Sequence, residues 1–195
     1  MAKQRSLGEY RAIDLGCLLL MLALFEPVLH FAATKLFPAE PYAVSAVAAL
    51  TAIVMMRWGP WAAIHAVLGG IVFAVASGGE AEHILIYSVG NLLSLAVLVY
   101  LRGPNKEKIR LNGTLSVLTA LAVQLLMLAG RAAVAAALRH PLSVCLGFIT
   151  TDFLSVLLTM VVIWVARKAD GLFEDQKHYL LCVQRERENE RRDQF

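Results

Sequence analysis

The sequence has few charged residues and few cysteines, and each shortage argues against a class of protein. Charged side chains make up 17% of its 195 residues, whereas a soluble domain has about 25%. The cysteines Cys17, Cys145 and Cys182 are far apart, with no CxxC pair and no Cys/His cluster. We therefore expect neither a disulfide framework nor a zinc site, and we predict no bound metal or cofactor.

The short motifs of common catalytic sites are also missing. The sequence contains no P-loop, no G-x-S-x-G and no H-E-x-x-H. A hydrolase needs a nucleophile and a base within reach of each other, and no spacing singles out Ser143 or Thr151 near Asp152 for that role. We expect no ATPase domain, no nucleic-acid partner and no catalytic residue, although a small membrane enzyme stays open as an alternative.

Long apolar runs are what the sequence has in excess. Hydrophobic residues make up 58% of it, against about 45–50% in soluble domains. Most of the runs have the length of a helix that crosses a hydrocarbon core about 30 Å thick. We predict an all-α, multi-pass integral membrane protein of the cell membrane, built as a bundle of six transmembrane helices. The predicted spans are 13–34, 42–56, 61–77, 84–101, 114–138 and 142–166.

The basic residues predict how this bundle is oriented. Lysine and arginine are concentrated before the first span, after the second, after the fourth and after the sixth. Six spans with both termini in the cytoplasm put all four basic segments inside. The loop with Glu80 and Glu82 then faces outward, and Arg139 with His140 is a mild exception. The basic residues concerned are Lys3, Arg5, Arg11, Arg57, Arg102, Lys106, Lys108, Arg110, Arg167 and Lys168.

The last part of the chain has a different composition. We divide the chain into a membrane domain at 1–168 and a cytoplasmic tail at 169–195. Apolar residues at helical spacing precede a wholly polar stretch, which predicts an amphipathic helix at the inner surface of the bilayer. A solvated helix end or a docking site for another subunit are the alternatives. The apolar residues are Leu172, Phe173, Tyr179, Leu180 and Val183.

Four ionisable residues lie inside predicted spans, where each costs roughly 2.5–3.5 kcal/mol on insertion scales and usually marks a site or path. They are Glu26, His30, Arg131 and Asp152. At about 1.5 Å of rise per residue, all four lie between the midplane and the outer surface. Glu26 and His30 are four residues apart and share a helix face. We predict either a substrate site or an ion pair that fastens helices, with Asn91 and Gln124 as weaker members.

Small residues repeat every fourth position in the third predicted span. Such a ridge allows another helix to approach closely. The partner is either a helix of the same chain or a second protein. The ridge consists of Ala62, Ala66, Gly70, Ala74 and Gly78, and a shorter one of Ala129, Ala133 and Ala137.

Two short stretches resemble a known family. Residues 56–63 (MRWGPWAA), which lead through Gly69 and Gly70, resemble the turn between the second and third spans of the S components of energy-coupling factor (ECF) vitamin transporters. Residues 87–91 (YSVGN) are similar to a Gly-Asn element of that group. The resemblance in architecture covers most of residues 10–168.

This resemblance implies a membrane-embedded binder of a vitamin or similar small polar nutrient. It would work with a transmembrane coupling subunit and two cytoplasmic ATPases. The family often has an Ala-x-x-x-Ala element in the first span for contact with the coupling subunit, whereas this chain has Gly16, Leu20 and Ala23 there. The alternative is a non-transport membrane subunit or scaffold whose buried polar residues only fasten helices.

Overall fold

The computed structural model describes residues 6–39, 42–169 and 171–193, and this part of the chain is all-helical. Capping defines the first helix, because the Ser6 side chain accepts a hydrogen bond from the Glu9 backbone and the Glu9 side chain accepts one from Ser6. The helices are α1 (Leu7–Leu36), α2 (Val47–Trp58), η1 (Gly59–Trp61), α3 (Ala62–Ala76), α4 (Ala81–Gly90), η2 (Asn91–Val99), α5 (Pro104–Leu111), α6 (Gly113–Ala137), α7 (Leu142–Thr150), α8 (Phe153–Ala166) and α9 (Gln176–Asp193).

Five helical segments of the described chain are long and apolar enough to cross a membrane. They are Leu7–Leu36, Val47–Ala76, Ala81–Val99, Gly113–Ala137 and Leu142–Ala166. The count differs from the predicted six because Val47–Ala76 contains most of the second and third predicted spans, 42–56 and 61–77, without a break in helical structure. Length and apolar character indicate a membrane protein.

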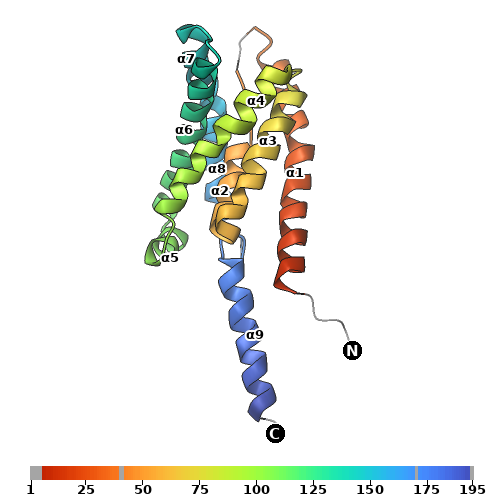
Figure 1. Cartoon of the computed structure of the whole chain (residues 1–195), viewed down its shortest axis with the longest axis vertical. Helices are drawn as coiled ribbons and strands as arrows, with labels where there is room; N and C mark the ends of the chain where they lie inside the picture. The colour runs from red at the N-terminus through yellow and green to blue at the C-terminus, as the bar shows by residue number, and fades with distance from the viewer. Residues whose placement is uncertain (1–5, 40–41, 170, 194–195) are drawn as a thin grey trace.

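Within Val47–Ala76 the chain reverses direction (Figure 1). Gly59 has a φ of 61°, a left-handed conformation that glycine adopts at little cost, and Pro60 follows it. The start of α2 therefore packs beside the middle of α3, and a Cβ atom on Gly69 would lie 2.8 Å from Val47 Cγ1. All twelve residues of α2 are buried, which makes α2 the central helix of the bundle.

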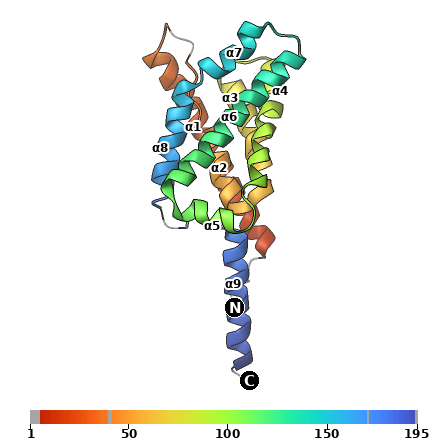
Figure 2. The ribbon, with the colours of Figure 1, turned by 90° about the vertical axis from the view of Figure 1, so that its left-hand side faces the viewer.

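The two ends of the bundle differ in charge. The start of α1, the α2–α3 turn, α5 and the end of α8 lie at one end, and α9 extends away from it (Figures 1 and 2). We call this the basic end, after its residues Arg57, Arg102, Lys106, Lys108, Arg110, Arg167 and Lys168. The ends of α1, α3 and α6 lie at the opposite end. The described members of the four basic segments thus lie at one end of the bundle, whereas Lys3 and Arg5 lie outside the described residues.

One face of α1 explains why the bundle needs an apolar environment. Leu20, Leu24, Val28 and Phe31 are each more than half exposed and follow helical spacing. The opposite face of α1 is buried against α2 and α3. A contiguous apolar stripe of this kind marks an interaction surface, and lipid is the natural cover for it.

Two of the predicted spans are not regular α-helices. The segment Ala81–Val99 changes from α to 3₁₀ geometry at Asn91. Residues 142–166, predicted as one helix, are interrupted by a turn at Thr151 and Asp152, where α7 ends and α8 begins. Asp152 therefore lies at the N-terminus of α8 and not in mid-helix.

The C-terminal segment joins the bundle only at its start. Phe173 is buried, and Leu172 and Leu180 pack against the apolar core. Lys106 Nζ lies 2.6 Å from Asp175 Oδ2, which ties α5 to this segment. Beyond these contacts α9 leaves the bundle (Figure 2), so residues 171–193 of the tail are anchored at their start and project away from the bundle at their end.

Candidate functional site

The site begins with a close approach of α4 and α6. A Cβ atom on Gly130 would overlap the Gly90 carbonyl oxygen, and one on Gly90 would lie 2.6 Å from the Arg131 backbone nitrogen. Only glycine at both positions allows this spacing. Because Asn91 follows Gly90 and Arg131 follows Gly130, the crossing brings these two side chains together.

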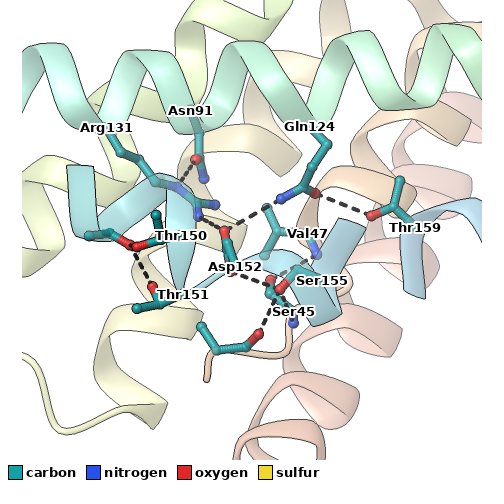
Figure 3. Close-up of polar contacts among 12 residues, drawn as sticks. Ser45, Val47, Asn91, Gln124, Arg131, Thr150, Thr151, Asp152, Ser155 and Thr159 are labelled. Atoms are coloured by element: carbon teal, nitrogen blue, oxygen red, sulfur yellow. Dashed lines mark hydrogen bonds and ion pairs between the residues drawn. The ribbon is translucent and has the colours of Figure 1, made fainter. Parts of the chain in front are cut away.

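Arg131 is the centre of the arrangement. Its Nε donates to Asn91 Oδ1 at 2.8 Å and its Nη1 to Asp152 Oδ2 at 2.7 Å (Figure 3). The guanidinium group also lies 4.5 Å from the centre of the Tyr87 ring, a favourable cation–π geometry. Asn91 in turn donates to the Ala66 carbonyl at 3.0 Å. Arg131 therefore connects α3, α4, α6 and α8.

Asp152 accepts bonds on both carboxylate oxygens. Ser155 Oγ donates to Oδ1 at 2.8 Å, and Gln124 Nε2 lies 3.4 Å from Oδ2, the oxygen that Arg131 also contacts. Gln124 Oε1 accepts from Thr159 Oγ1 at 3.2 Å. The position of Asp152 at the start of α8 adds the favourable field of a helix N-terminus.

The Glu26 side chain, which belongs to α1, caps the N-terminus of α2. Its Oε1 accepts from the Ala46 backbone N–H at 2.6 Å and from Ser45 Oγ at 3.3 Å. Ala46 is the N-cap residue of α2 and has no capping side chain, so Glu26 of α1 supplies that role. Glu26 is 0% exposed, and its Oε2 has no hydrogen-bond partner among the described residues.

Ser155 links the hydrogen bonds of Asp152 to those of Glu26. Its Oγ accepts from the Ser45 backbone N–H at 3.0 Å and lies 3.1 Å from the Ala43 carbonyl oxygen. The extended stretch before α2 is thereby held between Glu26 and Asp152. We call the connected set the polar network: Glu26, Ser45, Asn91, Gln124, Arg131, Asp152 and Ser155.

Five of the six predicted site residues belong to this network, and His30 does not. His30 is partly exposed, and its side chain makes no hydrogen bond among the described residues. Its backbone carbonyl accepts from Thr34 Oγ1. Four-residue spacing placed Glu26 and His30 on one face of α1, but Pro27 lies between them and only Glu26 reaches the interior.

The small-residue ridge lies against α4 and η2. A Cβ atom on Gly70 would lie 2.5 Å from the Tyr87 carbonyl oxygen, and the Ala66 carbonyl accepts the bond from Asn91. Ala62 and Ala74 are fully buried. Gly78 is outside this contact, since it lies in the turn after α3 with a φ of 71°.

Sequence reasoning missed the serines and a second polar cluster. No sequence pattern marked Ser45 as a site residue, and the only indication for Ser155 was its position three residues after Asp152. At the basic end, Arg57 donates to both oxygens of Asp14 at 2.8 and 2.7 Å, and Trp58 Nε1 donates to Asp14 at 2.5 Å. Arg57 entered the prediction as a basic residue of the charge pattern and as part of residues 56–63, and neither use predicted its contact with Asp14.

The polar network is closed in this structure, because each of its seven residues is at most 3% exposed. The described residues also form cavities of about 720, 320 and 270 Å³, and no wall of these includes a network residue. Among the described residues, no group of three or more His, Cys, Asp or Glu is arranged to hold a metal ion. The network combines one guanidinium group, two carboxyl groups and two helix N-termini, those of α2 and α8. Such a set can bind a charged or zwitterionic solute if it opens.

No family model, curated protein or solved structure matches the chain.

Proposed function

We propose that this chain is the substrate-binding membrane subunit of an ECF-type uptake transporter and takes a small polar or charged nutrient such as a vitamin. The polar network is the observation that supports this proposal. Ionisable side chains buried in an apolar bundle are costly and usually serve a site or a path. Interrupted helices whose N-termini meet such groups are a recurrent way to build solute sites in membranes.

Stability alone is a weak reason for this network. A buried ion pair is often no more stable than apolar residues of the same volume. The Glu26 carboxyl group has an oxygen without a partner among the described residues, and such a group adds a desolvation penalty. A solute that replaces some of the contacts within the network would account for both the buried ion pair and the unpartnered Glu26 oxygen.

The proposed topology has six crossings, with α2 and α3 as separate passes and the basic end in the cytoplasm. The gathering of basic residues at one end supports it through the positive-inside rule. In this orientation the network lies in the outer half of the bundle. The stretch that holds Ser45 and Ala46 is then the segment that moves to admit a solute, because it covers Glu26 and Ser155.

A coupling subunit and ATPases are the partners that this proposal requires. The exposed face of α1 is the proposed contact surface, since Gly16 and Leu20 lie on it and a Cβ atom on Gly16 would have no neighbour within 4 Å. Gly16 thus leaves room for a second helix to approach closely.

A second candidate function is supported by the closure of the network. Arg131 and both oxygens of Asp152 have partners within the chain. In this alternative the network only fastens helices, and the chain is a non-transport membrane subunit or scaffold. The two candidates make opposite predictions for Glu26, which caps α2 in both but contacts solute only in the first.

Native mass spectrometry of the detergent-purified chain distinguishes them. The variants are Glu26→Gln and, as a control, Thr51→Val, which changes another fully buried polar residue whose hydroxyl has no partner among the described residues. A co-purified small molecule present in wild type and Thr51→Val but absent from Glu26→Gln, at similar melting temperatures, supports the binder.

Two observations on the wild-type protein together would contradict the proposed binder. The purified protein would carry no small molecule, and no compound of a vitamin panel would raise its melting temperature. If Arg131→Ala then unfolds the protein while Glu26→Gln has little effect, the fastening role is favoured.

A further inference from the structure

A cavity of about 720 Å³ lies at the basic end, away from the polar network. The start of α1, the α2–α3 turn, the end of η2, and the starts of α5 and α9 enclose it. Its wall includes the apolar residues Leu7, Leu95, Leu98 and Val99. It also includes basic residues. A cavity with both kinds of wall suits a ligand that is itself part apolar and part anionic.

Two of the basic residues at the cavity are already neutralised. Arg57 lies 2.7 Å from Asp14, and Lys106 lies 2.6 Å from Asp175. Burial raises the pKa of Asp175, but hydrogen bonds from Lys106 and from the His178 backbone outweigh it and hold that pKa below its ordinary value. Asp175 is therefore a carboxylate at neutral pH, and its charge offsets that of Lys106.

Three other cations of the wall have no such partner. Arg11, Arg102 and Lys177 make no ion pair with a carboxylate among the described residues. They come from three separate segments, α1, the turn between η2 and α5, and the start of α9. Their combined charge of about +3 faces one volume, which an anion would stabilise.

Trp61 fixes the position of one of these cations. The Arg11 guanidinium lies 4.0 Å from the centre of the Trp61 ring, and Trp61 is 42% exposed. Tryptophan at the edge of an apolar bundle is typical of the level of lipid headgroups. Val99, an apolar residue of the same cavity wall, is 68% exposed, so this wall is open toward the surroundings of the bundle.

We propose that this cavity binds the phosphate-bearing headgroup of an anionic phospholipid, with Arg11, Arg102 and Lys177 at the phosphate and the acyl chains against Leu95, Leu98 and Val99. Basic pockets between helices on the cytoplasmic side are suited to such headgroups. A soluble phosphate compound would use the three cations but leave the exposed apolar wall uncovered. The proposal concerns a lipid and does not depend on the solute that the polar network binds.

Native mass spectrometry from nanodiscs of equal parts phosphatidylglycerol and phosphatidylcholine tests the proposal. We expect wild type to retain phosphatidylglycerol selectively. The variant Arg11→Gln/Arg102→Gln/Lys177→Gln is expected to lose roughly 100-fold in this preference, since each basic residue near a membrane surface contributes about a factor of five. The control Lys108→Gln/Arg167→Gln/Lys168→Gln removes the same charge from the basic end but from no wall of the cavity.

Three results would overturn the proposal. One is retention of both lipids equally by wild type, and another is an equal loss in the two triple variants, which would indicate diffuse electrostatics. The third is displacement of the retained lipid signal by millimolar inorganic phosphate, which would assign the site to a soluble anion. If the first triple variant does not fold, Arg102→Gln alone, at an exposed residue, is expected to reduce the preference about fivefold.

Discussion

Two arginine–aspartate pairs, with the same donor–acceptor distance of 2.7 Å, hold this bundle together in different surroundings. The side chains of Arg131 and Asp152 are 2% and 3% exposed, whereas those of Arg57 and Asp14 are 11% and 26% exposed. At the first pair, every charge must be balanced by another protein group. At the second, solvent can replace a lost partner. Equal geometry therefore does not mean equal energetic consequence, because the cost of an unpaired charge depends on its access to solvent.

The largest effect is expected for Arg131→Ala. This change leaves Asp152 buried without its cation, and breaking a buried pair from one side costs about 3–5 kcal/mol. The free energy of unfolding, measured by denaturant titration in mixed micelles, should fall by that amount. A fall below about 1 kcal/mol would mean that Asp152 is protonated or hydrated and that the pair is not a tight one.

Gly130→Ala tests whether the α4–α6 crossing creates the Arg131–Asn91 contact. The new methyl group would overlap the Gly90 carbonyl, and forced overpacking costs about 1–3 kcal/mol. We expect a loss in the upper half of that range. Gly147→Ala is the control, because a Cβ atom there has no neighbour within 4 Å. Equal melting temperatures for the two variants would contradict the close crossing.

Asp14→Ala breaks the more exposed pair. Arg57 keeps its bonds to the carbonyl oxygens of Gly171 and Leu172, at 2.8 and 3.1 Å, so we expect a smaller loss of about 1–2 kcal/mol. The measurement is the same unfolding titration. A loss as large as that of Arg131→Ala would remove the distinction drawn between the two pairs.

The smallest effect is expected at Asp175, a partly exposed partner of Lys106. Its pKa is lower in the folded protein than in the unfolded chain, so its contribution is present above about pH 4, the ordinary value, and is lost as the pH falls through the lowered pKa. For a solvent-screened pair we expect less than about 1 kcal/mol. Asp175→Asn should flatten the wild-type decrease in melting temperature below pH 4, and an unchanged profile would contradict this.

The sequence predicted the helices well because they follow from local composition. Long apolar runs mark the helices, and basic residues mark the segments between them. Five of six predicted site residues, including Glu26 and Arg131, lie in the polar network. The sequence did not predict the break at Asp152 or the bonds of Ser45 and Ser155, which depend on how distant segments pack. His30 was predicted from its ionisable side chain, its depth in the span and its helical spacing from Glu26, and none of these tells how far a helix is rotated toward the interior.

The enclosure of α2 has a consequence for how the chain enters a bilayer. A helix of twelve residues, all buried within the protein, gains nothing from contact with lipid and is shorter than the roughly 20 residues of a self-sufficient span. Its partners include α1, α3, α6 and α8. We expect α2 and α3 to leave the insertion machinery as one hairpin formed at Gly59, with α2 completing its packing only when the later helices have been synthesised.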